Sequence, residues 1–201
     1  MERRALEILT FWFGDLDEHG HVKQSRAALW WKGAEETDRL LRDRFADDLA
    51  RGAEGQRDHW AEHARGRLAL IITLDQFPRS MFRGTPRAFA ADARARELCL
   101  QGLARDQHRE LGLSERVFFY MPLEHAEDRD LQRRSVELFE ELLADAPGHL
   151  GEPYEAYLDY AVRHRDIVER FGRFPHRNAI LGRASTAEEL AFLEQPGSSF
   201  G

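Results

Sequence analysis

The chain has 201 residues, of which 42% are hydrophobic and 32% charged, and its formal net charge is −7. This length and composition are typical of one globular domain and exclude the collagen-like and disordered classes. The acidic balance argues against a general nucleic-acid binder, which needs a basic surface. We expect a single domain over residues 1–201, no nucleic-acid partner, and a flexible tail at 196–201, where glycine and serine gather.

Cysteine content and hydropathy indicate the compartment. Cys99 is the only cysteine, so it cannot form an intramolecular disulfide, and we expect a small buried thiol. No apolar run approaches the ~20 residues that a membrane span needs, and no cleavage pattern of a signal peptide follows the apolar stretch at 6–13. We therefore expect a cytoplasmic protein with no membrane partner. The sequence leaves the oligomeric state open.

Apolar residues in the first half of the chain recur with a period near 3.6, which predicts helices. The pattern places these helices at residues 5–13, 25–31, 34–50 and 58–74. Phe77-Pro78 should interrupt the last of them. The residue before a proline disfavours the α region, and proline suits the first turn of a new helix.

The second half of the chain shows the same period. Helices are predicted at 88–106, from Ser114 to a break at Met121-Pro122, at 128–144 and at 153–171. Pro175 should begin a short turn, and the spacing of Ser185 and Glu188 matches a capping box for a last helix. No segment alternates as strands do. We predict an all-α fold of stacked antiparallel helix pairs.

Polar side chains fall on three of the predicted inner faces, at Asp75, Gln132 and His164. A buried charge or amide costs several kcal/mol unless it is paired, so these groups need partners. The candidate partners cluster near the predicted helix breaks: Arg79, Arg83, Glu124, His125, Asp128, Arg173, His176, Arg177, Asn178 and Arg183.

Arginine and histidine gathered at proline-initiated helix starts combine guanidinium groups with free backbone N–H donors, which is the chemistry of a phosphate or carboxylate pocket. We therefore hypothesise a site for a small anion or an acidic peptide end between the two Phe-Pro turns. Its expected ligand-binding residues are Asp75, Arg79, Arg83, Gln132, His164, Arg173, His176, Arg177, Asn178 and Arg183. The alternative is a network of structural ion pairs that binds no ligand.

Three ordered motifs resemble the signatures of a bacterial domain-of-unknown-function family, number 924. They are LDQFPRSMFRGT at 74–85, FFYMPLEH at 118–125, and a third made of HRDI at 164–167, RFGRFPHRN at 170–178 and LGR at 181–183. The likeness runs from Leu9 to Phe200 and departs at Ser80 and Ala126, where the family pattern has Asn and Ser. The resemblance implies an all-α fold similar to tetratricopeptide-repeat proteins, and it implies no established activity.

Two further functions stay open at this point. A hydrolase or transferase could use Glu124, His125 and Asp128 as acid and base. No hydroxyl lies in a nucleophile-elbow motif, however. The sequence therefore leaves open whether the chain is an enzyme. A protein-interaction module that binds a peptide carboxylate would instead present an open groove. A small-molecule site predicts a closed cavity.

Metal and cofactor motifs give little support for a bound group. His59 and His63 are spaced i, i+4 as in many metal sites, but Trp60 stands where the usual catalytic glutamate would be. We interpret this pair as part of a solvated helix face. Because nucleotide-binding glycine motifs and C-x-x-C pairs are also absent from the sequence, we expect no metal and no cofactor.

Overall fold

The structure is a computed structural model that describes residues 2–199. Within these residues the only β-pairing is an isolated bridge between Leu16 and Val22, so the prediction of an all-α fold is confirmed. The α-helices are α1 (Arg3–Phe13), α2 (Ala27–Trp30), α3 (Glu35–Ala53), α4 (Ala64–Met81), α5 (Asp92–Leu103), α6 (Leu113–Glu124), α7 (Arg129–Asp145), α8 (Gly151–Phe171) and α9 (Ala187–Leu193). Short 3₁₀ helices lie between them: η1 (Asp58–Glu62), η2 (Pro86–Phe89), η3 (Gln107–Glu110), η4 (Gly148–Leu150) and η5 (Pro175–Arg177).

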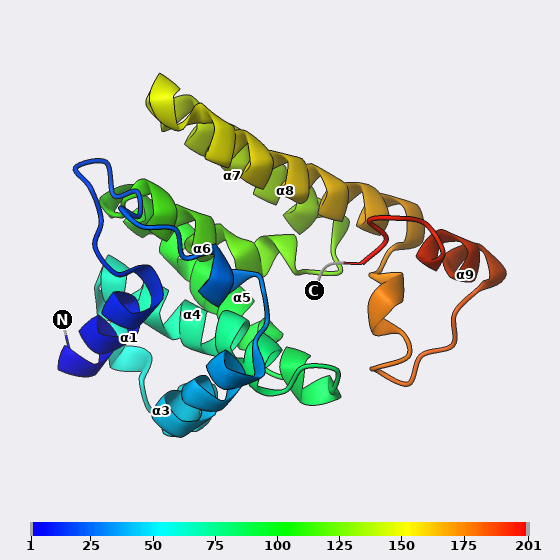
Figure 1. The fold of residues 1–201 in the computed structure, drawn as a ribbon, viewed down its shortest axis with the longest axis horizontal. Helices are drawn as coiled ribbons and strands as arrows, with labels where there is room; N and C mark the ends of the chain where they lie inside the picture. Colours follow the sequence, from blue (N-terminus) through cyan, green and yellow to red (C-terminus); the bar gives the residue numbers. More distant parts are fainter. Residues whose placement is uncertain (1, 200–201) are drawn as a thin grey trace.

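Helix α4 is the centre of the fold. Every residue from Arg67 to Phe77 is buried, as expected for a helix that is apolar on nearly all sides. Helices α1, α3, α5 and α6 pack around it (Figure 1). An aromatic group that includes Trp12, Phe77 and Phe118 fills the space between α1, α4 and α6. The polar residues of α4 are therefore surrounded by other helices.

Helices α7 and α8 form a long hairpin that packs on α6, and η5 and α9 follow at one end of it (Figure 1). The hairpin brings the last turns of α8 and the η5 segment next to the C-terminal end of α6. This arrangement places three stretches that are far apart in the sequence side by side. The likeness to tetratricopeptide-repeat proteins stays a prediction.

Two predicted breaks at prolines are wrong, because α4 continues through Pro78 and α6 continues through Pro122. Proline in a helix interior loses one hydrogen bond and strains the preceding turn. Here both prolines are buried in the core, and stopping either helix would expose the apolar side chains beyond it. Tertiary packing therefore outweighs the local preference.

Several helix ends also differ from the prediction. The segment predicted at 58–74 is divided, because His63 is extended (φ −116°, ψ 144°) between η1 and α4. Gly112, not Ser114, is the N-cap of α6. The capping box of α9 uses Thr186 and Glu189, one residue later than predicted, because Ser185 instead accepts a hydrogen bond from Asn178 (3.0 Å).

Cys99 is buried and free, as predicted. None of the helices in residues 2–199 is long and apolar enough to cross a membrane. In the segment predicted as a tail, Gly197 accepts a hydrogen bond from Arg163 and the Ser198 hydroxyl donates to the Leu193 carbonyl. Residues 200 and 201 lie outside the described residues, and the single domain and flexible tail stay predictions.

Replacing Gly66 by alanine should lower the free energy of unfolding by about 2 kcal/mol. Helix propensity alone would predict a gain of about 1 kcal/mol. However, a Cβ at Gly66 would lie 2.2 Å from the Trp60 carbonyl oxygen, an atom of the backbone that cannot rotate away. Urea unfolding followed by circular dichroism measures the change.

The matched control is Gly151→Ala at the start of α8, where an added Cβ meets only the Glu155 carboxylate at 4.0 Å. This variant should be as stable as the wild type or slightly more stable. A Gly66→Ala protein as stable as Gly151→Ala would contradict the close packing of η1 against α4.

Candidate functional site

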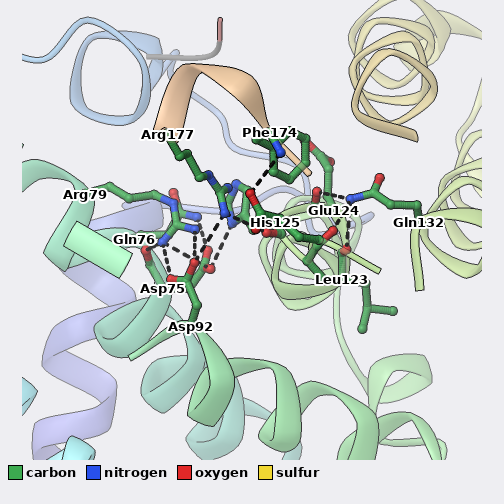
Figure 2. Close-up of polar contacts among 12 residues, drawn as sticks. Asp75, Gln76, Arg79, Asp92, Leu123, Glu124, His125, Gln132, Phe174 and Arg177 are labelled. Atoms are coloured by element: carbon green, nitrogen blue, oxygen red, sulfur yellow. Dashed lines mark hydrogen bonds and ion pairs between the residues drawn. The ribbon is translucent and has the colours of Figure 1, made fainter. Parts of the chain in front are cut away.

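A group of charged and polar side chains, here named the central cluster, lies where α4, α5, α6, α8 and η5 meet (Figure 2). Its members come from residues up to 102 positions apart in the sequence. The central cluster consists of Asp75 and Arg79 on α4, Asp92 on α5, Glu124 and His125 at the end of α6, His164 on α8, and Arg177 on η5.

Asp75 is the buried anchor of this cluster. Its Oδ1 lies 2.8 Å from Nδ1 of His125, and its Oδ2 accepts a hydrogen bond from the Gln76 amide at 2.5 Å. Burial raises the pKa of Asp75, but the charge of Arg79 and the contact with His125 outweigh it and hold that pKa well below its usual range. Asp75 is therefore a carboxylate that fixes the His125 ring.

Arg79 is held by two carboxylates and is already fully engaged. It donates two hydrogen bonds to Asp92, at 2.9 and 3.1 Å, and a third to the Asp75 carbonyl at 2.5 Å. Burial lowers the pKa of Arg79, but Asp75 and Asp92 raise it above its usual value. Such a bidentate pair is strong and geometrically specific.

Glu124 and His164 form a second contact, between α6 and α8. Oε1 of Glu124 lies 3.2 Å from Nδ1 of His164, and the same nitrogen lies 2.8 Å from the Tyr160 carbonyl oxygen. Burial, with repulsion from Asp75, raises the pKa of Glu124 to about 8. Burial also holds the pKa of His164 well below its usual value. Burial therefore favours the neutral form of both side chains.

Arg177 reaches from η5 toward Arg79, Asp92 and His125 (Figure 2). Its Nη1 donates to the His125 carbonyl at 3.0 Å and lies 3.8 Å from Oδ2 of Asp92. Its Nε is buried and has no partner within the described residues. Burial and the charge of Arg79 lower the pKa of Arg177 to about 10. This guanidinium is the least compensated charge of the cluster.

Two supporting contacts fix the backbone around the cluster. The Gln132 amide donates to the carbonyls of Glu124 and Ala126, at 2.6 and 2.8 Å, and so closes the end of α6. Glu127 accepts two hydrogen bonds from Arg183 and one from the Phe174 backbone N–H at 2.9 Å, which positions η5. Gln132 thus joins α7 to the end of α6, and Glu127 joins the turn between these helices to the segment around η5.

The structure does not place every predicted residue in the central cluster. Arg83 is half-exposed and lies 3.5 Å from Asp38, and Arg173 pairs with Glu189 at 2.6 Å. Asp128 accepts hydrogen bonds from the first turn of α7 and is its N-cap. The site expected between two Phe-Pro turns is corrected accordingly, since Phe77-Pro78 is part of α4 and only Phe174-Pro175 forms a turn.

Two more predicted residues lie beside the cluster. Asn178 is buried and donates to the Ser185 hydroxyl. His176 follows the η5 proline and contacts the Phe174 ring, with centroids 5.6 Å apart. Burial, with repulsion from Arg177, lowers the pKa of His176 to about 4, so it is neutral at pH 7.

Asp92 and Glu127 carry no specific signal in the sequence that would mark them as members of the site. Asp92 lies in the first turn of α5, where an acidic residue suits any helix start, so its pairing with Arg79 left no specific signal. Glu127 stands between Ala126 and Asp128, and proximity to the second motif was the only available hint. Both residues act through partners that are distant in the sequence.

Glu124, His125 and His164 also form a group with the composition of a metal site. One potential ligand atom from each, a carboxylate oxygen or a ring nitrogen, lies within 4.8 Å of the other two. Carboxylate and imidazole ligands are typical of zinc and other transition-metal centres. His59 and His63, the pair considered from the sequence, are exposed instead.

Comparison with known proteins places the chain in a family. The family model of bacterial proteins of unknown function, DUF924, matches residues 8–197. The chain is similar to a solved protein of unknown function from Agrobacterium tumefaciens, with 39% sequence identity, a TM-score of 0.81, and 95% of this chain and 97% of that chain covered. No curated protein matches it. The motifs, the fold and the family match agree, and the chain belongs to the bacterial DUF924 family.

Proposed function

We propose that the central cluster binds a small anion, of the phosphate or carboxylate class, in the cytoplasm. The observation that carries this proposal is the buried Nε of Arg177, which has no partner within the described residues. A buried donor without an acceptor costs about 1–3 kcal/mol, and more on a charged group. An anion beside Arg177 would accept this hydrogen bond and balance its charge.

Burial of the cluster favours a small molecule over a peptide end. The Asp75, His164 and Arg177 side chains are at most 7% exposed, so an extended chain has no access to them without rearrangement. Two surface clefts, of about 270 and 470 Å³, lie around α1 and include no residue of the central cluster. This burial favours a small ligand enclosed by the cluster over a chain bound along a groove.

Thermal unfolding in the presence of inorganic phosphate tests the proposal. Phosphate at constant ionic strength should raise the Tm of the wild type, because a ligand that binds only the folded state stabilises it by about 2.7 kcal/mol at 100 times its Kd. Arg177→Gln should lose this increase. Arg83→Gln, which removes a half-exposed guanidinium outside the cluster, should keep it.

The same series decides against the proposal in two cases. A wild type whose Tm does not respond to phosphate, pyrophosphate or citrate would contradict it. An Arg177→Gln protein that keeps the wild-type shift would also do so, because the anion would then bind elsewhere.

A second candidate function is acid–base catalysis at His125. The 2.8 Å contact between Asp75 Oδ1 and His125 Nδ1 would hold the imidazole in one tautomer, as a carboxylate does for a catalytic histidine. Glu124, the next residue along the chain, would be the second proton-transfer group. A screen of chromogenic phosphate and carboxylate esters would support this function if hydrolysis by the wild type were lost in His125→Asn. Retention of that hydrolysis in the variant would contradict it.

A further inference from the structure

The end of α6 and the middle of α8 bring together two imidazoles and one carboxylate that the proposed anion site does not use as anion ligands. Glu124 and His125 are consecutive at the end of α6, and His164 faces them from α8. The His125 and His164 rings have centroids 6.2 Å apart. Glu124 and His164 are buried, and the His125 side chain is 14% exposed. The three side chains therefore face one another in a site that is largely shielded from solvent.

The spacing of these groups suits a single metal ion. The potential ligand atoms all lie within 4.8 Å of one another. Ligand atoms that bind one tetrahedral ion at about 2.1 Å lie about 3.4 Å apart, so the three atoms must approach one another by at most about 1.4 Å to hold the ion. Side-chain rotation within a cluster allows a movement of this size.

The partners of the two histidines have the pattern seen around bound metals. Nδ1 of His125 lies 2.8 Å from the Asp75 carboxylate, and Nδ1 of His164 lies 2.8 Å from the Tyr160 carbonyl. A metal-binding histidine typically donates one ring N–H to a carboxylate or carbonyl, which orients the ring and leaves the other nitrogen to bind the ion. Both rings have such an acceptor here.

Carboxylates lie beside both arginines of the cluster. Arg79 is paired with Asp75 and Asp92, and Arg177, the less compensated of the two, lies 3.8 Å from Asp92. A dication that displaces the proton of Glu124 adds one net positive charge to this group. That charge would favour an anion in a remaining coordination position.

We propose that Glu124, His125 and His164 bind one divalent transition-metal ion of the Zn²⁺ or Fe²⁺ class. Three protein ligands of this type leave open positions for water or a ligand, as in catalytic rather than structural zinc sites. The inference goes beyond the proposed anion site and does not depend on it, because the ion is held by residues other than Arg177.

Metal content and affinity test this inference directly. Untagged protein, stripped with a chelator and dialysed, is incubated with Zn²⁺, separated from free metal by gel filtration and analysed by mass spectrometry. We expect one Zn²⁺ per chain in the wild type. Glu124→Gln and His164→Gln should weaken Zn²⁺ affinity in calorimetry by about 100-fold or more. The control His59→Ala/His63→Ala, which removes the exposed histidine pair, should bind Zn²⁺ as the wild type does.

Zinc-edge X-ray absorption of the wild type keeps the test valid if a variant fails to fold. Two imidazole ligands and one carboxylate in the zinc spectrum support the proposal. It is overturned if the wild type retains no Zn²⁺, if fewer than two imidazoles bind the ion, or if binding is lost in the His59/His63 variant but not in the folded Glu124 and His164 variants. Phosphate titration of the metal-free protein tests the anion site by itself. Failure of the anion site is thereby distinguished from failure of the metal site.

Discussion

Replacement of Asp75 by asparagine is expected to lower the free energy of unfolding by about 3 kcal/mol. Asparagine keeps the shape of the side chain but removes its charge, so Asp92 becomes the only carboxylate paired with Arg79 among the described residues. It also presents an N–H₂ group where aspartate has an accepting oxygen. Either Gln76 or His125 then loses its acceptor in the core. Urea unfolding at pH 7, followed by tryptophan fluorescence, measures the loss.

The matched control for Asp75 is Asp47→Asn. Asp47 pairs with Arg51 on the surface of α3, and its side chain is 69% exposed. Such a pair contributes less than about 1 kcal/mol, so the control should change stability by about 0.5 kcal/mol or less. An Asp75→Asn protein with an equally small loss would contradict the view that Asp75 anchors the cluster.

Replacement of Arg67 by alanine should cause a still larger loss, of about 4 kcal/mol. The Arg67 side chain is buried in the core, where Nε donates to the Gln107 amide oxygen at 2.5 Å, and the Nη groups donate to the carbonyls of Leu98 and Ala61 at 3.0 and 2.8 Å. None of these partners is a carboxylate, and burial lowers the pKa of Arg67. Alanine would leave a cavity and remove the donor of these three hydrogen bonds.

Two further variants separate the contributions at Arg67. Arg67→Met fills most of the volume but donates no hydrogen bond, so it should still lose about 2 kcal/mol or more through the lost hydrogen bonds to Gln107, Leu98 and Ala61. Arg51→Ala removes a half-exposed arginine and should change stability by about 0.5 kcal/mol or less. If Arg67→Met were as stable as Arg51→Ala, the buried hydrogen bonds would contribute nothing.

The helical fold was predictable from the sequence because its signal is local. Apolar residues at a period of 3.6 mark α1, α3, α7 and α8 within a few residues of their observed ends. The errors arise where long-range packing overrides a local preference, as at Pro78 and Pro122, which lie inside buried helices. The sequence around each proline does not show how much apolar surface the helix buries after that proline.

Only those residues of the candidate site that lie on the apolar faces of predicted helices were predictable from the sequence. Asp75 and His164 stand on apolar faces, which shows from the sequence alone that they need partners. Arg67 carries the same signal, since it precedes Ile71 and Leu74 by four and seven residues, and it was overlooked. The partner of each arginine depends on tertiary contacts. The sequence therefore does not show that Arg177 belongs to the cluster while Arg173 pairs with Glu189 outside it.

The most direct test of the account is an anomalous diffraction experiment on crystals soaked in selenate, an anion with the shape of phosphate. The account predicts an anomalous selenium peak inside the central cluster, about 4 Å from Nε of Arg177, where a selenate oxygen accepts the Nε hydrogen bond. Selenate bound only at exposed arginines such as Arg83, with no peak beside Arg177, would contradict it.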